Sequence, residues 1–255
     1  MFIIKKLNRT GEIGINNKGL IMKIVKYNNK NDIDILFDNG YIAKNRRYYD
    51  FKNGSIKNVY YPSVLNKGYV GEGEYRVSNN NKATIAYEKW NSMLSRCYSK
   101  HELKRYPKYQ GCEVVDEWLN YQNFAKWFYD NYYEIENQIM CLDKDILCKN
   151  NKIYSPTTCC IVPNDINVLL TKSDTARGKY YIGVTFDKAA NMYVAQCQRK
   201  FKTVFIGYFP SETEAFLAYK KAKEQEVKDR ANEYKDKLPF NVYEALINYE
   251  VEITD

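Results

Sequence analysis

The chain of 255 residues has 27% charged and 15% aromatic side chains, a composition that is typical of a folded globular protein and excludes a disordered one. Its formal net charge of +8 favours an anionic partner. No apolar run approaches the ~20 residues that span a bilayer, and the N-terminal apolar stretch is too short for a signal peptide, so we expect no membrane segment and a cytoplasmic location.

Residues 1–60 have the pattern of a small β-rich module. Apolar runs at 20–25 and 33–37 are separated by a polar turn, and Asp38-Asn39-Gly40 is a hairpin signal before a third run. Several short strands with tight turns predict a barrel-like fold of the SH3 kind. Residues 61–82 are rich in Gly, Asn and Ser, and we interpret them as a linker.

Residues 83–172 predict a mixed α+β region that begins with two helices. The first helix starts near Thr84, and its apolar stripe recurs at three- and four-residue spacing: Ala86, Trp90, Met93, Leu94 and Cys97. The second helix is expected at 120–132, with an aromatic face that indicates core packing.

A strand, a turn and a further helix complete this region. The strand is expected at 141–147, the polar turn at 149–152 and the return strand at 153–154. Ser155-Pro156 then predicts the start of a helix-like segment that runs through Leu170.

The C-terminal part predicts a three-stranded antiparallel sheet followed by a helix. A polar linker at 173–178 precedes strands at 181–186, 192–198 and 203–209. Ser211 and Glu214 form a capping box, so a helix is expected to begin there and to end near Lys235. We place this module at 179–236 and a C-terminal tail at 237–255.

Three elements of this module resemble an AP2 DNA-binding domain in order and spacing. They are Gly183-Val184, Ile206-Gly207-Tyr208-Phe209 and Glu214-Ala215-Phe216-x-Ala218-Tyr219. The resemblance implies that the three strands lie in the major groove of DNA and that the helix packs on the opposite face. It places the base-facing role on Thr185, Gln196, Gln198, Thr203 and Phe205.

The charge of the same segment points to the same partner. From Arg177 to Lys202 there are six basic residues and one acidic residue. Basic side chains beside the strands would contact phosphates and set the register, and we assign that role to Arg177, Lys179, Arg199, Lys200 and Lys202. AP2 domains of plants carry arginine at several base-facing positions and this chain does not, so their GC-rich preference is not carried over. Glutamine suits adenine, and threonine suits the thymine methyl group.

The central region resembles the HNH-type, homing-endonuclease-like proteins of phages, which often carry a C-terminal AP2-like module. The likeness spans 84–172 and rests on these motifs: Trp90-x-x-Met93-Leu94-x-Arg96-Cys97, Gly111-Cys112-x-Val114, Glu117-Trp118, Leu142-Asp143-Lys144-Asp145 and Tyr154-Ser155-Pro156. It implies a ββα finger that holds one divalent metal, with a histidine that activates water for phosphodiester hydrolysis.

The residues of this chain match that site only in part. Asp143 matches the acidic metal ligand and Asn167 matches the helix position. Lys144 stands where the general-base histidine is expected, and a lysine ammonium has no acceptor for the proton of water. His101, the single histidine, lies upstream in a polar stretch and is interpreted as a surface residue.

Two explanations stay open for the finger. It is either a structural, DNA-binding relic, or Asp143 and Asp145 form a different carboxylate site that binds Mg²⁺ or another divalent metal. The two aspartates share a face of the strand, from which Lys144 points away.

Seven cysteines at irregular spacing, without a secretion signal, indicate reduced thiols. Cys141, Cys148, Cys159 and Cys160 lie close together but contain no CxxC pair. A zinc site at these cysteines is a further open alternative.

Taken together, the sequence predicts an α+β, multi-domain protein of a phage or mobile element that binds double-stranded DNA and carries a degenerate HNH-like region. The first alternative is an active, metal-dependent HNH-type endonuclease or nickase of the homing type. The second is a basic module that binds a protein or RNA partner.

Overall fold

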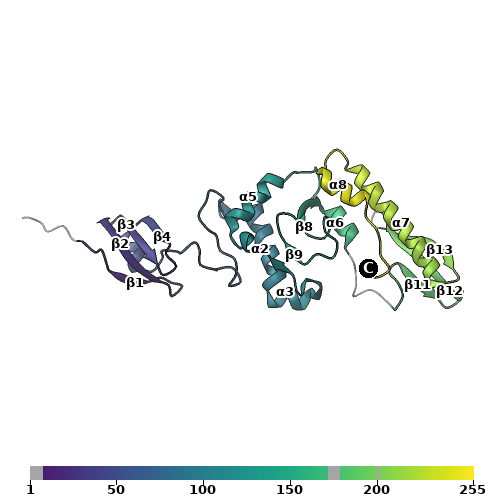
Figure 1. Ribbon diagram of the computed structural model, residues 1–255, viewed down its shortest axis with the longest axis horizontal. Coiled ribbons are helices and arrows are strands. Elements are labelled where there is room, and N and C mark those ends of the chain that lie inside the picture. Colours follow the sequence, from purple (N-terminus) through teal and green to yellow (C-terminus); the bar gives the residue numbers. More distant parts are fainter. Residues whose placement is uncertain (1–7, 172–178, 200–201) are drawn as a thin grey trace, which may run out of the picture. The chain divides into compact units, whose positions relative to one another are not determined.

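The computed structural model describes residues 8–171, 179–199 and 202–255 (Figure 1). Helices alternate with short strands, and the fold class is mixed α+β, as expected. The chain forms two compact units, one of residues 1–102 with 116–126 and the other of residues 103–115 with 127–255. The finer division expected from the sequence stays a prediction, and its linker at 173–178 lies outside the described residues.

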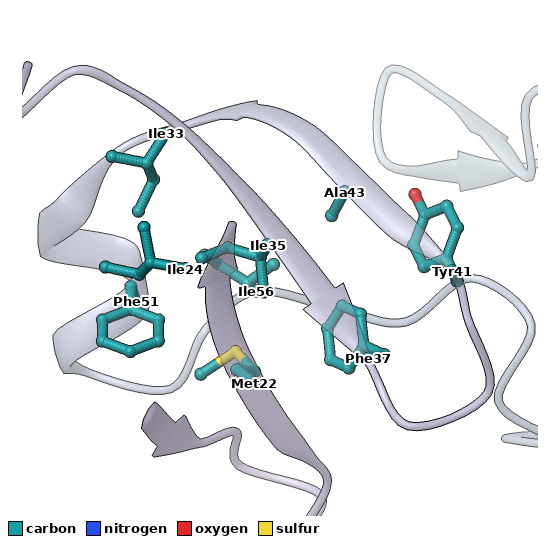
Figure 2. Close-up of a cluster of buried hydrophobic side chains, with 9 residues drawn as sticks. All are labelled: Met22, Ile24, Ile33, Ile35, Phe37, Tyr41, Ala43, Phe51 and Ile56. Atoms are coloured by element: carbon teal, nitrogen blue, oxygen red, sulfur yellow. The ribbon is translucent and has the colours of Figure 1, made fainter. Parts of the chain in front are cut away.

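An antiparallel sheet forms the N-terminal part of the first unit. Its strands follow the chain order: β1 (Ile13–Ile15), β2 (Ile21–Asn29), β3 (Asp32–Phe37) and β4 (Ile42–Arg46). Buried side chains alternate with more accessible ones along β3 and the first part of β2, so one face of the sheet forms a core that helix α1 (Tyr48–Lys52) helps to cover. Figure 2 shows the nine side chains of this core.

The barrel-like closure expected for this module is wrong. In the described part of the chain β1 pairs with β2 alone and β4 with β3 alone, so the sheet is open at both edges. The three residues of β1 are too few to reach back to β4, and the chain enters helix α1 after β4 instead of adding a closing strand.

The rest of the first unit contains the two expected helices. A short hairpin of β5 (Ser78–Asn79) and β6 (Lys82–Ala83) leads into α2 (Ile85–Tyr98), and the Thr84 hydroxyl caps this helix by accepting from the amide of Tyr87. The predicted apolar stripe of α2 is buried, and its Trp90 Nε1 donates to the carbonyl of Trp118 at 2.7 Å. The following helices are α3 (Lys100–Arg105), α4 (Asp116–Leu119) and α5 (Tyr121–Asn131), of which α3 and α5 each contribute residues to both units.

The second unit contains a ββα arrangement, here called the finger. Strand β8 (Met140–Asp143) pairs antiparallel with β10 (Cys160–Pro163), and α6 (Asn164–Leu170) follows directly. A 3₁₀ turn at Pro107–Tyr109 leads to β7 (Glu113–Val114), which pairs in parallel with β9 (Ile153–Tyr154).

Two local expectations for this arrangement are wrong. The return strand of β8 is β10 and not residues 153–154, which pair with β7. The helix begins at Asn164 and not at Ser155, because the Ser155 hydroxyl accepts the amide of Thr158 in a tight turn and the chain then forms the fully buried β10. A buried strand of this length has no alternation by which to recognise it.

The C-terminal part has the expected sheet and helix. Strands β11 (Val184–Asp187), β12 (Met192–Arg199) and β13 (Lys202–Phe209) are antiparallel in chain order, and α7 (Glu212–Glu233) packs along them (Figure 1). The Ser211 hydroxyl caps α7 by accepting from the amide of Glu214 at 3.3 Å. Residues 237–255, expected to be a tail, contain α8 (Phe240–Ile247) and bury apolar side chains.

Helix α7 belongs to two cores at once. Its first half packs Ala215, Phe216 and Tyr219 against the sheet. Its second half packs Val227 and Ala231 against β10, α6 and α8. The sheet and the ββα arrangement are therefore joined through one helix.

Charged side chains on the buried stripe of α7 each have a partner. The ammonium of Lys223 donates to the carbonyl of Leu169 in the last turn of α6, and burial lowers the pKa of this lysine. Arg230 lies 3.3 Å from the carboxylate of Asp165 on α6. The hydroxyl of Tyr234 donates to the same carboxylate at 2.8 Å.

We expect Asp165→Ala to lower the free energy of unfolding by about 3 kcal/mol, because a buried guanidinium then loses a counter-charge. Asp229→Ala is the matched control, since Asp229 is half exposed and its ion pair with Arg199 is worth less than about 1 kcal/mol. Urea unfolding followed by circular dichroism measures both. Equal losses in the two variants would contradict the role given to Asp165.

Candidate nucleic-acid interface

One face of the three-stranded sheet is left uncovered by α7. Helix α7 covers the face that carries Val184, Ala195 and Cys197, which are buried. Side chains alternate along a strand, and residues opposite one another in an antiparallel pair share a face. The register pairs Gln196 with Phe205 and Gln198 with Thr203, so these side chains lie on the open face.

Thr185 joins them there, because it is exposed and neighbours the buried Val184 on β11. The structure therefore brings together all five residues that were assigned to base contacts. Their side chains are half-buried or exposed.

Tyr208 also lies on this face, and sequence reasoning missed it. A bulge between Ala195 and Gln196 shifts the register of β13, so that Tyr208 lies opposite Val194. Its ring contacts Phe205 edge to face at 5.2 Å, and its hydroxyl donates to the carboxylate of Asp187 at 3.1 Å. Unbroken alternation from Thr203 and Phe205 would have placed Tyr208 on the covered face, and no signal in the sequence marks the bulge.

Asp187 gives one end of the open face a fixed negative charge. Its carboxylate accepts from the backbone amides of Ala189 and Ala190 and from the Tyr208 hydroxyl. These hydrogen bonds lower the pKa of the Asp187 carboxyl. Phosphate contacts are therefore expected at the other end of β12, beside the β12–β13 hairpin.

The basic residues predicted to contact phosphates differ in exposure and in their partners. Lys202 is exposed at the start of β13, and the Lys179 ammonium lies 5.0 Å from the centre of the Tyr180 ring. Arg199 lies on the face that α7 covers and forms ion pairs with this helix. Its Nε is 3.1 Å from the carboxylate of Glu226, and its Nη2 is 3.6 Å from that of Asp229. Arg177 and Lys200 lie outside the described residues.

Gly183 holds the start of the sheet against α7. Its φ is +75°, and a Cβ at this position would fall on the ring of Tyr219. A side chain at 183 therefore costs both backbone strain and a steric clash.

We expect Gly183→Ala to lower the free energy of unfolding by about 1–3 kcal/mol more than Gly111→Ala, because only the first substitution also overpacks a core. Gly111 is a matched control, since its φ is +74° and nothing lies within 4 Å of an added Cβ. Thermal and urea unfolding measure the difference. Indistinguishable losses would mean that the Tyr219 contact does not constrain the sheet.

The finger holds Asp143 at the end of β8. Its Oδ1 accepts from the backbone amides of Asp145 at 2.7 Å and Ile146 at 2.8 Å, which fixes the turn after the strand. Burial raises the pKa of the Asp143 carboxyl, although the two amides act in the opposite direction. The contacts of this carboxylate are those of a turn-forming residue.

Lys144 is buried, with 6% of its surface exposed, at the position of the expected general base. Its ammonium donates to both carboxylate oxygens of Asp145, at 2.7 and 2.8 Å, and to the carbonyl of Asn151. It also lies 5.9 Å from the centre of the Tyr154 ring. A fixed cation therefore occupies this position, and it cannot accept a proton from water.

The remaining candidates do not form a metal site with Asp143. Asp145 is engaged by Lys144, and the backbone carbonyl of Asn167 on α6 accepts from the hydroxyl of Thr171. Within the described residues no three His, Cys, Asp or Glu side chains are grouped so that they could hold a metal ion, including the four cysteines considered for zinc. His101 is 81% exposed beside Glu102. The donor set thus does not fit a divalent metal.

Comparison of the chain with known protein families, curated proteins and solved structures gave no match. Among the helices that the structure describes, none is both long and apolar enough to cross a membrane. The likeness to AP2 domains and to HNH proteins therefore rests on the residue motifs and stays a proposal.

We expect purified protein not to nick supercoiled plasmid in Mg²⁺ or Mn²⁺, because the position of the general base carries a paired ammonium. General bases typically contribute roughly 10²- to 10⁴-fold to rate. Gel electrophoresis of the plasmid measures this. Metal-dependent nicking that disappears in Asp143→Ala would contradict the expectation and favour an active nuclease.

Proposed function

We propose that this protein binds double-stranded DNA with the open face of β11–β13. The observation that carries the proposal is that Thr185, Gln196, Gln198, Thr203 and Phe205 share one uncovered sheet face, while α7 covers the other. The major groove admits a small β-ribbon, and its base edges carry a distinct pattern of donors and acceptors.

The side chains of this face suit direct contacts to bases. Gln196 and Gln198 each have an amide that can donate to adenine N7 and accept from adenine N6. The threonine methyl groups and the Phe205 ring suit the thymine methyl group. Such a surface favours A·T pairs over G·C pairs.

The charge distribution of the sheet gives the direction of docking. Asp187 lies at the β11–β12 end, and Lys202 lies at the β12–β13 end. The exposed Lys202 attracts phosphate at its end of the sheet, so we assign a phosphate contact to Lys202.

The finger supports a non-catalytic role. Its aspartates and Lys144 contact one another and nearby backbone groups, and they leave the chemistry of hydrolysis without a base. We therefore propose a regulator or antagonist of the phage or mobile-element type that acts in the cytoplasm and retains the finger as structure.

Two substitutions separate base contacts from phosphate contacts. We expect Gln196→Ala to weaken binding to the preferred duplex by roughly 1–3 kcal/mol and to scrambled DNA by little. We expect Lys202→Ala to weaken binding to all duplexes alike and to reduce the slope of log K against log salt by about 0.9. Fluorescence anisotropy at several salt concentrations measures both effects.

Gln225→Ala and Lys221→Ala are the matched controls, because both residues are exposed on α7, on the other side of the sheet. They are expected to bind as the wild type does. If Gln196→Ala and Lys202→Ala bind equally well, the sheet is not the reading surface. Tighter binding to RNA or to an acidic protein than to duplex DNA would favour the other class of partner.

A further inference from the structure

A second basic surface lies in the last residues of α3 and the 3₁₀ turn that follows it. Residues 103–112 contain Lys104, Arg105 and Lys108 and no acidic residue. All three basic side chains are exposed. This segment belongs to the same compact unit as the finger.

Two tyrosine rings accompany the basic side chains. The Arg105 guanidinium lies 5.1 Å from the centre of the Tyr106 ring, and the Lys108 ammonium lies 5.4 Å from that of Tyr109. The two rings contact edge to face at 6.4 Å. Contact with a ring restricts where a long cationic side chain can point, so part of the entropic cost of binding an anion is met beforehand.

Lys152 joins this surface from a distant part of the sequence. Its ammonium donates to the carbonyl of Lys108 at 2.9 Å, and its own carbonyl accepts from the amide of Glu113 at 2.8 Å. The parallel pairing of β7 with β9 continues from this point. We name Lys104, Arg105, Lys108 and Lys152 the basic turn; its connection to the segment between β8 and β10 runs through Lys108 and Lys152.

The basic turn has no counter-charge among the described residues. In the part of the chain that the structure describes, none of its four side chains forms an ion pair with a carboxylate. In the same unit, by contrast, Lys144, Lys149 and Arg230 are each paired with aspartate. Cations that are close together and unpaired favour an external polyanion, because binding relieves their mutual repulsion.

We propose that the basic turn is a second DNA-binding surface, which contacts the phosphates of the duplex. This inference rests on the proposed function and deepens it. Phosphate contacts carry no sequence information, so this surface adds affinity and salt dependence without changing the preferred site. Duplex DNA is favoured over an acidic peptide because the proposed DNA-binding face of β11–β13 belongs to the same compact unit as the basic turn.

The test is the double variant Lys104→Gln with Lys108→Gln. Two lost phosphate contacts should reduce the slope of log K against log salt by about 1.8. Between about 50 and about 200 mM salt, the variant should therefore lose roughly tenfold less affinity than the wild type loses. The ratio of affinities for preferred and scrambled duplexes should not change.

Lys235→Gln with Lys237→Gln is the matched control. It removes the same charge from two exposed lysines of the same unit, which lie between α7 and α8. This control should keep the slope of the wild type. Thermal unfolding of both double variants shows whether each is folded, and Lys152→Gln gives a further single-charge variant should one of them not fold.

The outcomes separate the two proposals. If the basic-turn variant keeps the wild-type slope while Gln196→Ala loses the preferred site, the further inference is wrong and the proposed function stands. A change in the ratio of preferred to scrambled binding would also overturn it, because phosphate contacts cannot discriminate sequence. If the wild type binds no duplex, both proposals fail.

Discussion

The second unit depends on the burial of charged side chains along one helix. A buried ion is costly unless it is paired, and α7 places Lys223, Glu226 and Arg230 on its packed stripe. Each is met by a group from another element: a carbonyl at the end of α6, a guanidinium from β12 and a carboxylate from α6. These contacts are directional, so they fix how α7 lies on the finger more closely than apolar packing would.

The same pairing decides which charges are left for a partner. Arg199 follows the two glutamines of the open face, yet it is engaged by Glu226 and Asp229, while Lys202 across the hairpin is exposed. In the finger, Lys144 and Asp145 neutralise one another, whereas no carboxylate of the described residues pairs with the basic turn. Counting basic residues along the sequence cannot make this distinction, because internal pairing depends on contacts between distant elements.

Local patterns in the sequence predicted the three longest of the described helices, α2, α5 and α7, and the C-terminal hairpins. The stripe from Ala86 to Cys97, the cap at Ser211 and the three C-terminal strands are all as expected, because each depends on neighbours within a few residues. What failed depended on tertiary contacts: the open N-terminal sheet, the pairing of β8 with β10 and the bulge that turns Tyr208 outward. In the candidate site, period-two alternation predicted that the base-contact residues share a face. It did not predict the ion pairs of Arg199 with Glu226 and Asp229.

Because α7 is buried on two sides, the C-terminal sheet and its helix do not form a self-contained domain. In a DNA-binding domain that folds by itself, the helix would pack against its own sheet alone. Here, cutting the chain before Lys179 and after Tyr234 would strip Val227 and Ala231 of their apolar neighbours and leave Lys223 and Arg230 without their acceptors on α6. We therefore expect that neither the sheet with α7 nor the finger keeps its full stability as a separate fragment of this chain.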